Sequence, residues 1–140
     1  MKTIYLITFL LLLTISMFGQ NQIIGKWLSE DKEAITEIYE HSGKFYGKIV
    51  WLKKPNDENG NILKDTENPD IKLRQRTISD LVIVNNLSYK NKEWVDGTVY
   101  DPKTGKTYDC KLWLTDNNTL NLRGYAGFFH STETWSRTKL

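Results

Sequence analysis

The chain has 140 residues and carries 19 Lys and Arg against 17 Asp and Glu, so its net charge is close to zero. This balance predicts no electrostatic attraction to nucleic acid or to an anionic membrane. The single cysteine, Cys110, excludes an intrachain disulfide, and two histidines with one cysteine do not supply the three or four ligands of a zinc site. Side-chain packing must therefore hold the fold together, and 5 Trp, 7 Tyr and 5 Phe are its expected source.

The N-terminal residues have the pattern of an export signal. Lys2 precedes an uncharged apolar run over residues 4–17, and Gly19 offers a small residue for cleavage. The run is shorter than the roughly 20 residues that a membrane-spanning helix needs. We therefore expect a signal peptide over residues 1–19 and one domain over residues 20–140, located in the periplasm or secreted, without membrane insertion after cleavage.

In the rest of the chain, apolar and polar residues alternate in short segments. Turn sequences, such as those around Gly43 and Gly105, separate these segments. The expected strands cover residues 24–28, 34–40, 45–52, 81–85, 94–100, 107–114, 120–125 and 132–137. Consecutive hairpins of this kind predict an antiparallel meander. Closing the meander removes its exposed edges, so the expected fold is all-β, an eight-stranded antiparallel up-and-down barrel. Its interior is expected either to be filled by side chains or to hold one small ligand.

One segment, residues 53–76, interrupts this pattern with charges of both signs, two prolines and almost no apolar residues. Connections of this length in compact domains are either functional or disordered. Within the segment, Asn68 as the cap and Pro69 at the first helical position allow a short helix that extends through Leu73.

Gly25-Lys26-Trp27 resembles the glycine-x-tryptophan signature that opens lipocalin-like barrels. In such barrels a late arginine packs across the tryptophan, and the resemblance assigns that part to Arg137 or Arg123. The resemblance also includes residues 47–52, 55–57, 68–70, 73–76, 97–102, 105–108, 123–125 and 134–135. In order, these segments are similar to the exported bacterial family called domain of unknown function 2147, which is described as lipocalin-like barrels without an established ligand or activity. Thr77 stands where that family usually has a proline.

Five residues are candidates for contacts with a ligand at the barrel or its rim. Trp51, Tyr100 and Tyr108 either line a cavity or simply fill the interior of a small barrel. Arg74 and Arg76 either form an anion site at the rim or belong to a solvated loop.

Arg123 is the sixth candidate and has two interpretations. Its planar fork suits bidentate capture of a ligand carboxylate. Alternatively, it stacks on Trp27 or Trp135 as part of the closure of the barrel.

The sequence shows no catalytic or metal constellation. His130 and Ser131 are adjacent in sequence, whereas a catalytic triad requires spatial placement and a third orienting group. Residues 57–68 resemble a calcium loop, but Ile62 and Asn68 replace its glycine and glutamate. We therefore predict no catalytic residue, no metal and no cofactor.

The leading hypothesis is an exported small β-barrel that binds an apolar or amphipathic small molecule of unknown identity. The alternative is an envelope interaction or structural module with a filled barrel, in which residues 53–76 contact the partner. An enzyme is the third reading and would need a site centred on His130 and Ser131 or on an arginine. The oligomeric state is left open.

Overall fold

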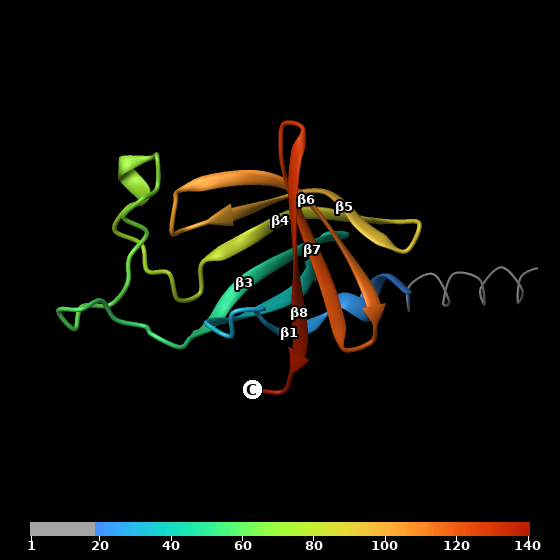
Figure 1. Cartoon of the computed structure of the whole chain (residues 1–140), viewed down its shortest axis with the longest axis horizontal. Coiled ribbons are helices and arrows are strands. Elements are labelled where there is room, and N and C mark those ends of the chain that lie inside the picture. Colours follow the sequence, from blue (N-terminus) through green and yellow to red (C-terminus); the bar gives the residue numbers. More distant parts are fainter. Residues whose placement is uncertain (1–18) are drawn as a thin grey trace, which may run out of the picture.

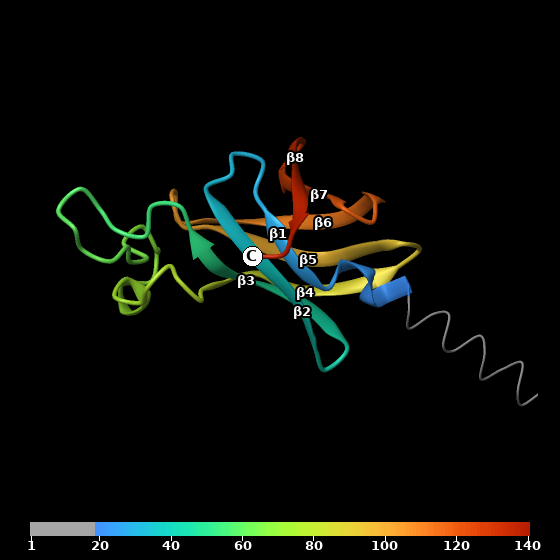
Figure 2. The ribbon, with the colours of Figure 1, turned by 90° about the horizontal axis from the view of Figure 1, so that it is seen from below.

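The computed structural model describes residues 19–140 and arranges their eight strands as one closed antiparallel barrel (Figures 1 and 2). Each strand pairs with the next, and β1 (Gly25–Leu28) also pairs with β8 (Phe129–Thr138), which closes the barrel. The others are β2 (Ala34–His41), β3 (Lys44–Leu52), β4 (Val82–Lys90), β5 (Glu93–Asp101), β6 (Lys106–Asp116) and β7 (Thr119–Ala126). The predicted eight-stranded up-and-down barrel is therefore confirmed.

Two short 3-10 helices, η1 (Asn21–Ile23) and η2 (Ile71–Leu73), accompany the barrel in the described part of the chain. No helix there has the length and apolar character needed to cross a membrane. The expected signal peptide falls almost entirely on residues 1–18, which lie outside the described residues.

The side chain of Trp27 closes one end of the barrel. Its side chain is fully buried, and its Nε1 donates a 2.9 Å hydrogen bond to the carbonyl oxygen of Ile23. The guanidinium carbon of Arg137 lies 4.3 Å from the centre of its ring. Gly25 has a φ of 136°, and a Cβ at this position would lie 2.8 Å from Arg137 Nη1, so glycine makes room for the guanidinium. The expected stack of a late arginine on Trp27 is therefore present, and the arginine is Arg137.

Side chains fill the barrel next to this stopper. Gly47 and Gly97 leave no space for a methyl group, because a Cβ would lie 2.9 Å from Ile38 Cδ1 at Gly47 and 2.7 Å from Leu87 Cδ2 at Gly97. The buried cluster also includes Trp27, Phe45, Ile49, Val84, Trp94, Cys110, Leu112, Leu120, Leu122 and Trp135. Over this part of its length the barrel is solid, and the aromatic residues that fill it are Trp27, Phe45, Trp94 and Trp135.

A β-bulge moves Trp51 away from the position that alternation predicts. Thr36 pairs with Ile49, but the register then shifts and Ile35 pairs with Trp51. The extra residue reverses the alternation, and the Trp51 side chain is 41% exposed. The expectation that Trp51 faces the barrel interior is therefore wrong.

A second irregularity explains why β4 is longer than the predicted strand over residues 81–85. Asn86 adopts a φ of 58°, and the pairing of β3 with β4 shifts between Gly47–Val84 and Phe45–Leu87. Asparagine tolerates this left-handed conformation better than most residues. The consecutive asparagines therefore form a bulge inside the strand and do not end it.

The connection between β3 and β4 lies to one side of the barrel, where it forms the green segment of Figures 1 and 2. It meets the turn between β5 and β6 at Gly105, where a Cβ would lie 2.0 Å from the carbonyl oxygen of Glu67. Gly105 also has a φ of 73°, so only glycine fits this contact without strain. The connection is thus a docked part of the fold.

Candidate binding site

A fully buried carboxylate, Asp65, fastens this connection to the barrel wall. Its Oδ1 accepts a 2.5 Å hydrogen bond from the Tyr100 hydroxyl. Its Oδ2 accepts hydrogen bonds of 2.8 Å from Asn68 Nδ2 and 2.9 Å from Arg76 Nε. Buried carboxylates require such partners, and here three donors converge from β5 and from two parts of the connection. We call these four residues the Asp65 clamp.

The clamp shifts the protonation equilibria of its members in opposite directions. Burial raises the pKa of Asp65, but the hydrogen bonds from Tyr100, Asn68 and Arg76 and the charge of Arg76 outweigh it, so the pKa lies below its ordinary value. Burial and the bond to Asp65 raise the pKa of Tyr100 to about 12. At neutral pH, Asp65 is therefore ionised and Tyr100 is a neutral donor.

Asn68 also organises the backbone that follows it. Its Oδ1 accepts a 2.8 Å hydrogen bond from the backbone N–H of Asp70, and its carbonyl oxygen accepts one of 2.7 Å from Arg74 Nε. Helix η2 is present within the predicted segment, but its cap is Asp70, whose side chain accepts from the N–H of Lys72 at 3.0 Å. The expectation that Asn68 caps the helix is therefore wrong, because its side chain is engaged with Asp65 and Asp70.

Strand pairing places Tyr100 on the outer face of the barrel wall. Val84 pairs with Val99. Val84 packs inside the barrel, because a Cβ added at Gly47 would lie 3.1 Å from the Val84 Cβ. Successive residues of a strand point to opposite faces, so Tyr100 and its partner Thr107 face outward. Tyr100 is nevertheless buried, because the connection covers it.

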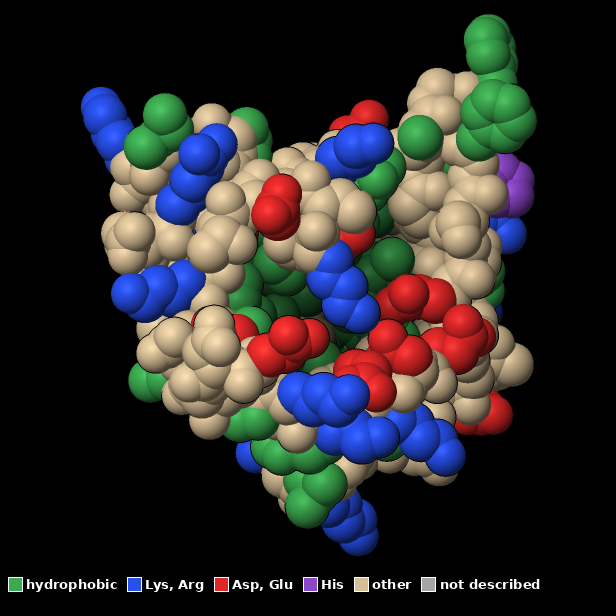
Figure 3. Space-filling view, turned by 60° about the vertical axis from the view of Figure 1, so that its left-hand side comes forward, with side chains coloured by type: hydrophobic (Ala, Val, Ile, Leu, Met, Phe, Trp, Pro, Cys, Tyr) green, Lys and Arg blue, Asp and Glu red, His purple; other side chains and the backbone are tan. Residues whose placement is uncertain are grey.

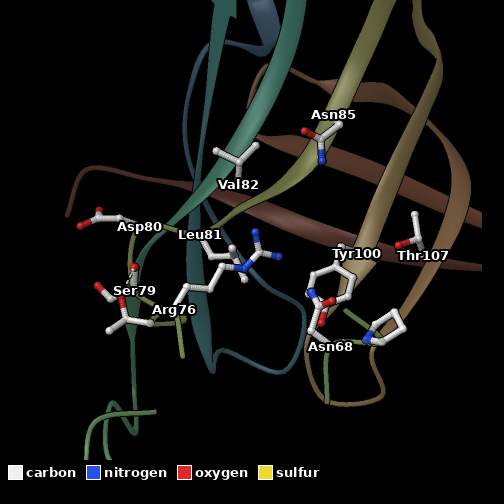
Figure 4. Close-up of a pocket in the computed structure, with 11 residues that line it drawn as sticks. Asn68, Arg76, Ser79, Asp80, Leu81, Val82, Asn85, Tyr100 and Thr107 are labelled. Carbon is white, nitrogen blue, oxygen red and sulfur yellow. Dashed lines mark hydrogen bonds between the residues drawn. The ribbon is translucent and has the colours of Figure 1, made fainter. Parts of the chain in front are cut away.

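A pocket of about 650 Å³ lies between the connection and strands β4, β5 and β6 (Figure 4). Arg76, Leu81, Val82 and Tyr100 contribute to its walls. Its other polar lining residues are Asn68, Thr77, Ser79, Asp80, Asn85 and Thr107. Figure 3 shows a hollow on the side of the connection, with hydrophobic side chains at its floor and a Lys or Arg side chain extending across it.

Arg76 uses only part of its hydrogen-bonding capacity in the Asp65 clamp. Its Nε donates to Asp65, and its guanidinium carbon lies 6.0 Å from the centre of the Tyr100 ring. Within residues 19–140 no atom accepts a hydrogen bond from its two η nitrogens, and the side chain is 39% exposed. In Figure 4 the guanidinium lies between Leu81 and Tyr100, while the carboxylate of Asp80 points away from it. The two η nitrogens of Arg76 are therefore available to donate hydrogen bonds to a ligand in the pocket, and the bond to Asp65 fixes the orientation of the guanidinium.

Of the six predicted ligand contacts, Arg76 and Tyr100 line this pocket. Arg74 contacts the clamp residue Asn68, but its Nε already donates a hydrogen bond to the Asn68 carbonyl oxygen. Tyr108 is half-buried on the inner face, where its Cβ would lie 3.7 Å from a Cβ at Gly124.

The structure separates Trp51 and Arg123 from this group. The guanidinium carbon of Arg123 lies 5.0 Å from the ring centre of Trp113, and its Nε donates a 2.8 Å hydrogen bond to Thr132 Oγ1. The interpretation that Arg123 stacks on Trp27 or Trp135 is therefore wrong. Lys111, the strand partner of Arg123, lies over the same indole at 5.4 Å, so this surface is built on Trp113.

Asp65 and Asn68 are site residues that no pattern in the sequence identifies. In the sequence, Asp65 lies within the calcium-like residues 57–68 and Asn68 occupies the position of a helix cap. The donor on Tyr100 is 35 residues away from Asp65 and the donor on Arg76 is 11 away, so no local pattern joins them. The signal that remains is an acidic residue followed by Asn68 and Arg76 in a segment otherwise poor in apolar residues.

A closed eight-stranded antiparallel barrel with an arginine stacked on the stoppering tryptophan defines a lipocalin-like protein. The chain belongs to the family described as "Uncharacterized protein conserved in bacteria (DUF2147)", whose profile matches residues 25–137. It is similar to a solved structure, "Protein HP1028 from the human pathogen Helicobacter pylori belongs to the lipocalin family", with 27% identity, a TM-score of 0.70 and coverage of 84% of this chain and 83% of that chain. No curated protein matches the chain. The expected family and fold are thereby confirmed.

Proposed function

We propose that the protein is an exported binding protein that holds a small amphipathic molecule in the pocket between the connection and strands β4–β6. The lipocalin-like fold supports small-molecule binding in general. The observation that carries the proposal is Arg76, whose Nε is fixed by Asp65 while its η nitrogens face the pocket. Ligand sites typically combine a concave surface with a few placed polar groups of this kind.

The arrangement favours a ligand with an anionic head and an apolar body. The guanidinium fork matches the two oxygens of a carboxylate, and charge-assisted bonds of this kind are stronger than neutral ones. Leu81, Val82 and the Tyr100 ring offer apolar contact beside it. The Asp65 clamp holds the fork before the ligand arrives, which lowers the entropy cost of binding.

Export is part of the proposal and is supported by the apolar leader over residues 4–17. The mass of the protein recovered from the periplasm or medium tests it. Cleavage after Gly19 predicts a mature chain that begins at Gln20.

A thermal-shift and calorimetric titration with laurate, a twelve-carbon carboxylate, tests the binding proposal. Laurate should raise the Tm of wild-type protein in a saturable way, and dodecanol, which lacks the carboxylate, should do so less. Arg76→Gln should lose the preference for laurate, whereas Arg123→Gln removes a cation outside the pocket and should keep it.

A pocket-filling variant separates ligand binding from the Asp65 clamp. Thr107 is exposed at the pocket and takes no part in the clamp, so Thr107→Trp should block laurate and leave the Tm of the free protein near wild type. Equal laurate binding by Thr107→Trp and wild type would place the ligand elsewhere. A wild-type protein that responds to neither probe would contradict the proposal.

Two observations favour the second candidate, an interaction module with a filled barrel. The interior is solid around Gly47 and Gly97, and the connection exposes Ile62 (60%) and Ile71 (73%) to solvent. Capture of envelope proteins by wild type but not by the double variant Ile62→Ser, Ile71→Ser would support it. Identical capture of envelope proteins by wild type and by the double variant would contradict this second function.

A further inference from the structure

The turn between β7 and β8 exposes two adjacent phenylalanines. Phe128 is 104% and Phe129 is 81% exposed, the two highest values among the large hydrophobic residues of the described chain. Figure 1 shows this hairpin extending beyond the other strands. Gly127, with a φ of 60°, forms the turn, and a Cβ there would have no neighbour within 4 Å. The two rings therefore stand in open solvent at the end of a projection.

The projection is an ordered part of the barrel. Strand pairing continues without a register shift from Thr119–Ser136 to Ala126–Phe129, the last pair before the turn. Below the tip, the side chains of Tyr125 and His130 pair edge to face with their ring centres 6.1 Å apart. The hairpin thus holds the two phenylalanines at a fixed height above the barrel.

We infer that the Phe128–Phe129 tip inserts into the interfacial region of a lipid bilayer. Two phenylalanine side chains bury at most roughly 500 Å² together, whereas a stable protein interface needs about 800 Å² from each partner. His130, Ser131 and Thr132 follow the tip and are polar and exposed, so no apolar collar enlarges the patch. A bilayer interface needs no complementary surface and accepts a small aromatic projection.

The charges near the tip specify how this contact works. Partial desolvation raises the pKa of Glu133 on β8, and the nearby carboxylates of Asp31, Glu30 and Asp101 raise it further. Positive charge lies among these carboxylates as well, since Lys103 Nζ is 3.9 Å from Asp31 Oδ2, so the side chains near Glu133 form no purely basic patch for anionic headgroups. Membrane contact through the tip is apolar in origin, so it is insensitive to salt and does not require anionic lipid.

The position of the tip determines which end of the barrel would face the membrane. In an up-and-down barrel the β7–β8 turn, the β5–β6 turn and the β3–β4 connection belong to the same end. The tip and the connection nevertheless extend in different directions, the tip upward and the connection to the left in Figure 1. The inference rests on the tip alone and does not depend on the proposed pocket.

Flotation with phosphatidylcholine vesicles tests the inference on residues 20–140, which contain every strand of the barrel. Wild type should float with the vesicles, with the same yield at low and high salt and with or without added phosphatidylglycerol. The double variant Phe128→Ser, Phe129→Ser should bind at least about tenfold more weakly, because two aromatic side chains lose their apolar contact. The double variant Phe128→Trp, Phe129→Trp should float like wild type, since tryptophan also favours the interface.

The matched control is Ile62→Ser, Ile71→Ser, which removes two exposed apolar side chains from the connection and should float like wild type. Failure of the wild type to float with either vesicle would overturn the inference. So would equal flotation of the serine tip variant, or loss of binding at high salt. Tip-dependent dimerisation of the free protein in sedimentation velocity would reassign the two rings to a second copy of the chain.

Discussion

The Tyr100 hydroxyl donates a 2.5 Å hydrogen bond to Asp65, a carboxylate with no exposed surface, and so links strand β5 to a residue 35 positions earlier. Asn68 and Arg76 complete the coordination of that carboxylate from the connection itself. A long polar segment is thereby held in place by one buried charge. The pocket beside Arg76 exists because that charge is satisfied.

Removing the carboxylate should destabilise the protein strongly. Asp65→Ala leaves the Tyr100 hydroxyl and the Asn68 amide without their acceptor, and we expect the free energy of unfolding to fall by about 2–4 kcal/mol. Asp57→Ala is the control, because Asp57 is an exposed residue that bonds only to nearby backbone N–H groups of the same connection. Urea unfolding followed by tryptophan fluorescence measures both. A loss at Asp65 no larger than at Asp57 would show that the clamp is unimportant.

The same carboxylate should make stability depend on acid pH. The pKa of Asp65 is lower in the folded protein than its ordinary value of 3.8, so its contribution is fully present above 3.8 and is lost as pH falls through the lowered pKa. Asp65→Asn cannot lose a proton. The difference in unfolding free energy between wild type and Asp65→Asn should therefore be constant near neutral pH and shrink below pH 3.8. A difference independent of pH would contradict an ionised, clamped Asp65.

The contact of the connection with the β5–β6 turn can be tested with two glycines. Gly105 and Gly60 have φ values of 73° and 80°, but only at Gly105 would a Cβ meet the carbonyl oxygen of Glu67, at 2.0 Å. Gly60→Ala should cost about 1–2 kcal/mol from backbone strain alone. Gly105→Ala should cost clearly more and should speed hydrogen exchange in the connection. Equal effects would mean that the two segments do not pack together.

The two arginines that stack on tryptophans should differ in their importance. Arg137 lies on Trp27 and its guanidinium also donates to the carbonyl oxygens of Gln22, Ile24 and Asn117. We expect Arg137→Ala to reduce the free energy of unfolding by about 2–3 kcal/mol, through lost cation–π contact and three lost hydrogen bonds.

Arg123→Ala is the matched comparison for Arg137→Ala. Arg123 stacks on Trp113 at the outer surface and makes one side-chain hydrogen bond there, so the loss should stay within about 1 kcal/mol. The midpoints of guanidinium unfolding compare the two variants directly. A larger effect at Arg123 would refute the assignment of Arg137 as the closing arginine.

The sequence predicts the barrel because the information for it is local. Alternation marks the strands, turn residues separate them, and Gly25 beside Trp27 marks the stoppered end. The exceptions are positions that pairing across strands decides. Trp51 faces outward because of a bulge opposite Ile35. The sequence of β3 contains no residue pattern that predicts this shift in strand register.

The site was predictable only in part. Arg76 and Tyr100 were identified as candidates, but their relationship depends on Asp65, which contacts them from a distant part of the chain. Asp65 is buried because the connection folds back over β5, and this is a tertiary effect without a local signature. The contact of Arg123 also has no local signal, because its partner Trp113 is on a neighbouring strand.

Hydrogen exchange of wild-type protein with and without laurate tests the central claim most directly. The account predicts that laurate slows exchange in residues 76–82, at the end of the connection and the start of β4, and at Tyr100 and Thr107, which line the pocket with Arg76. Protection confined to β1, β2 and β8, with none at residues 76–82, would place the ligand inside the barrel and contradict the account.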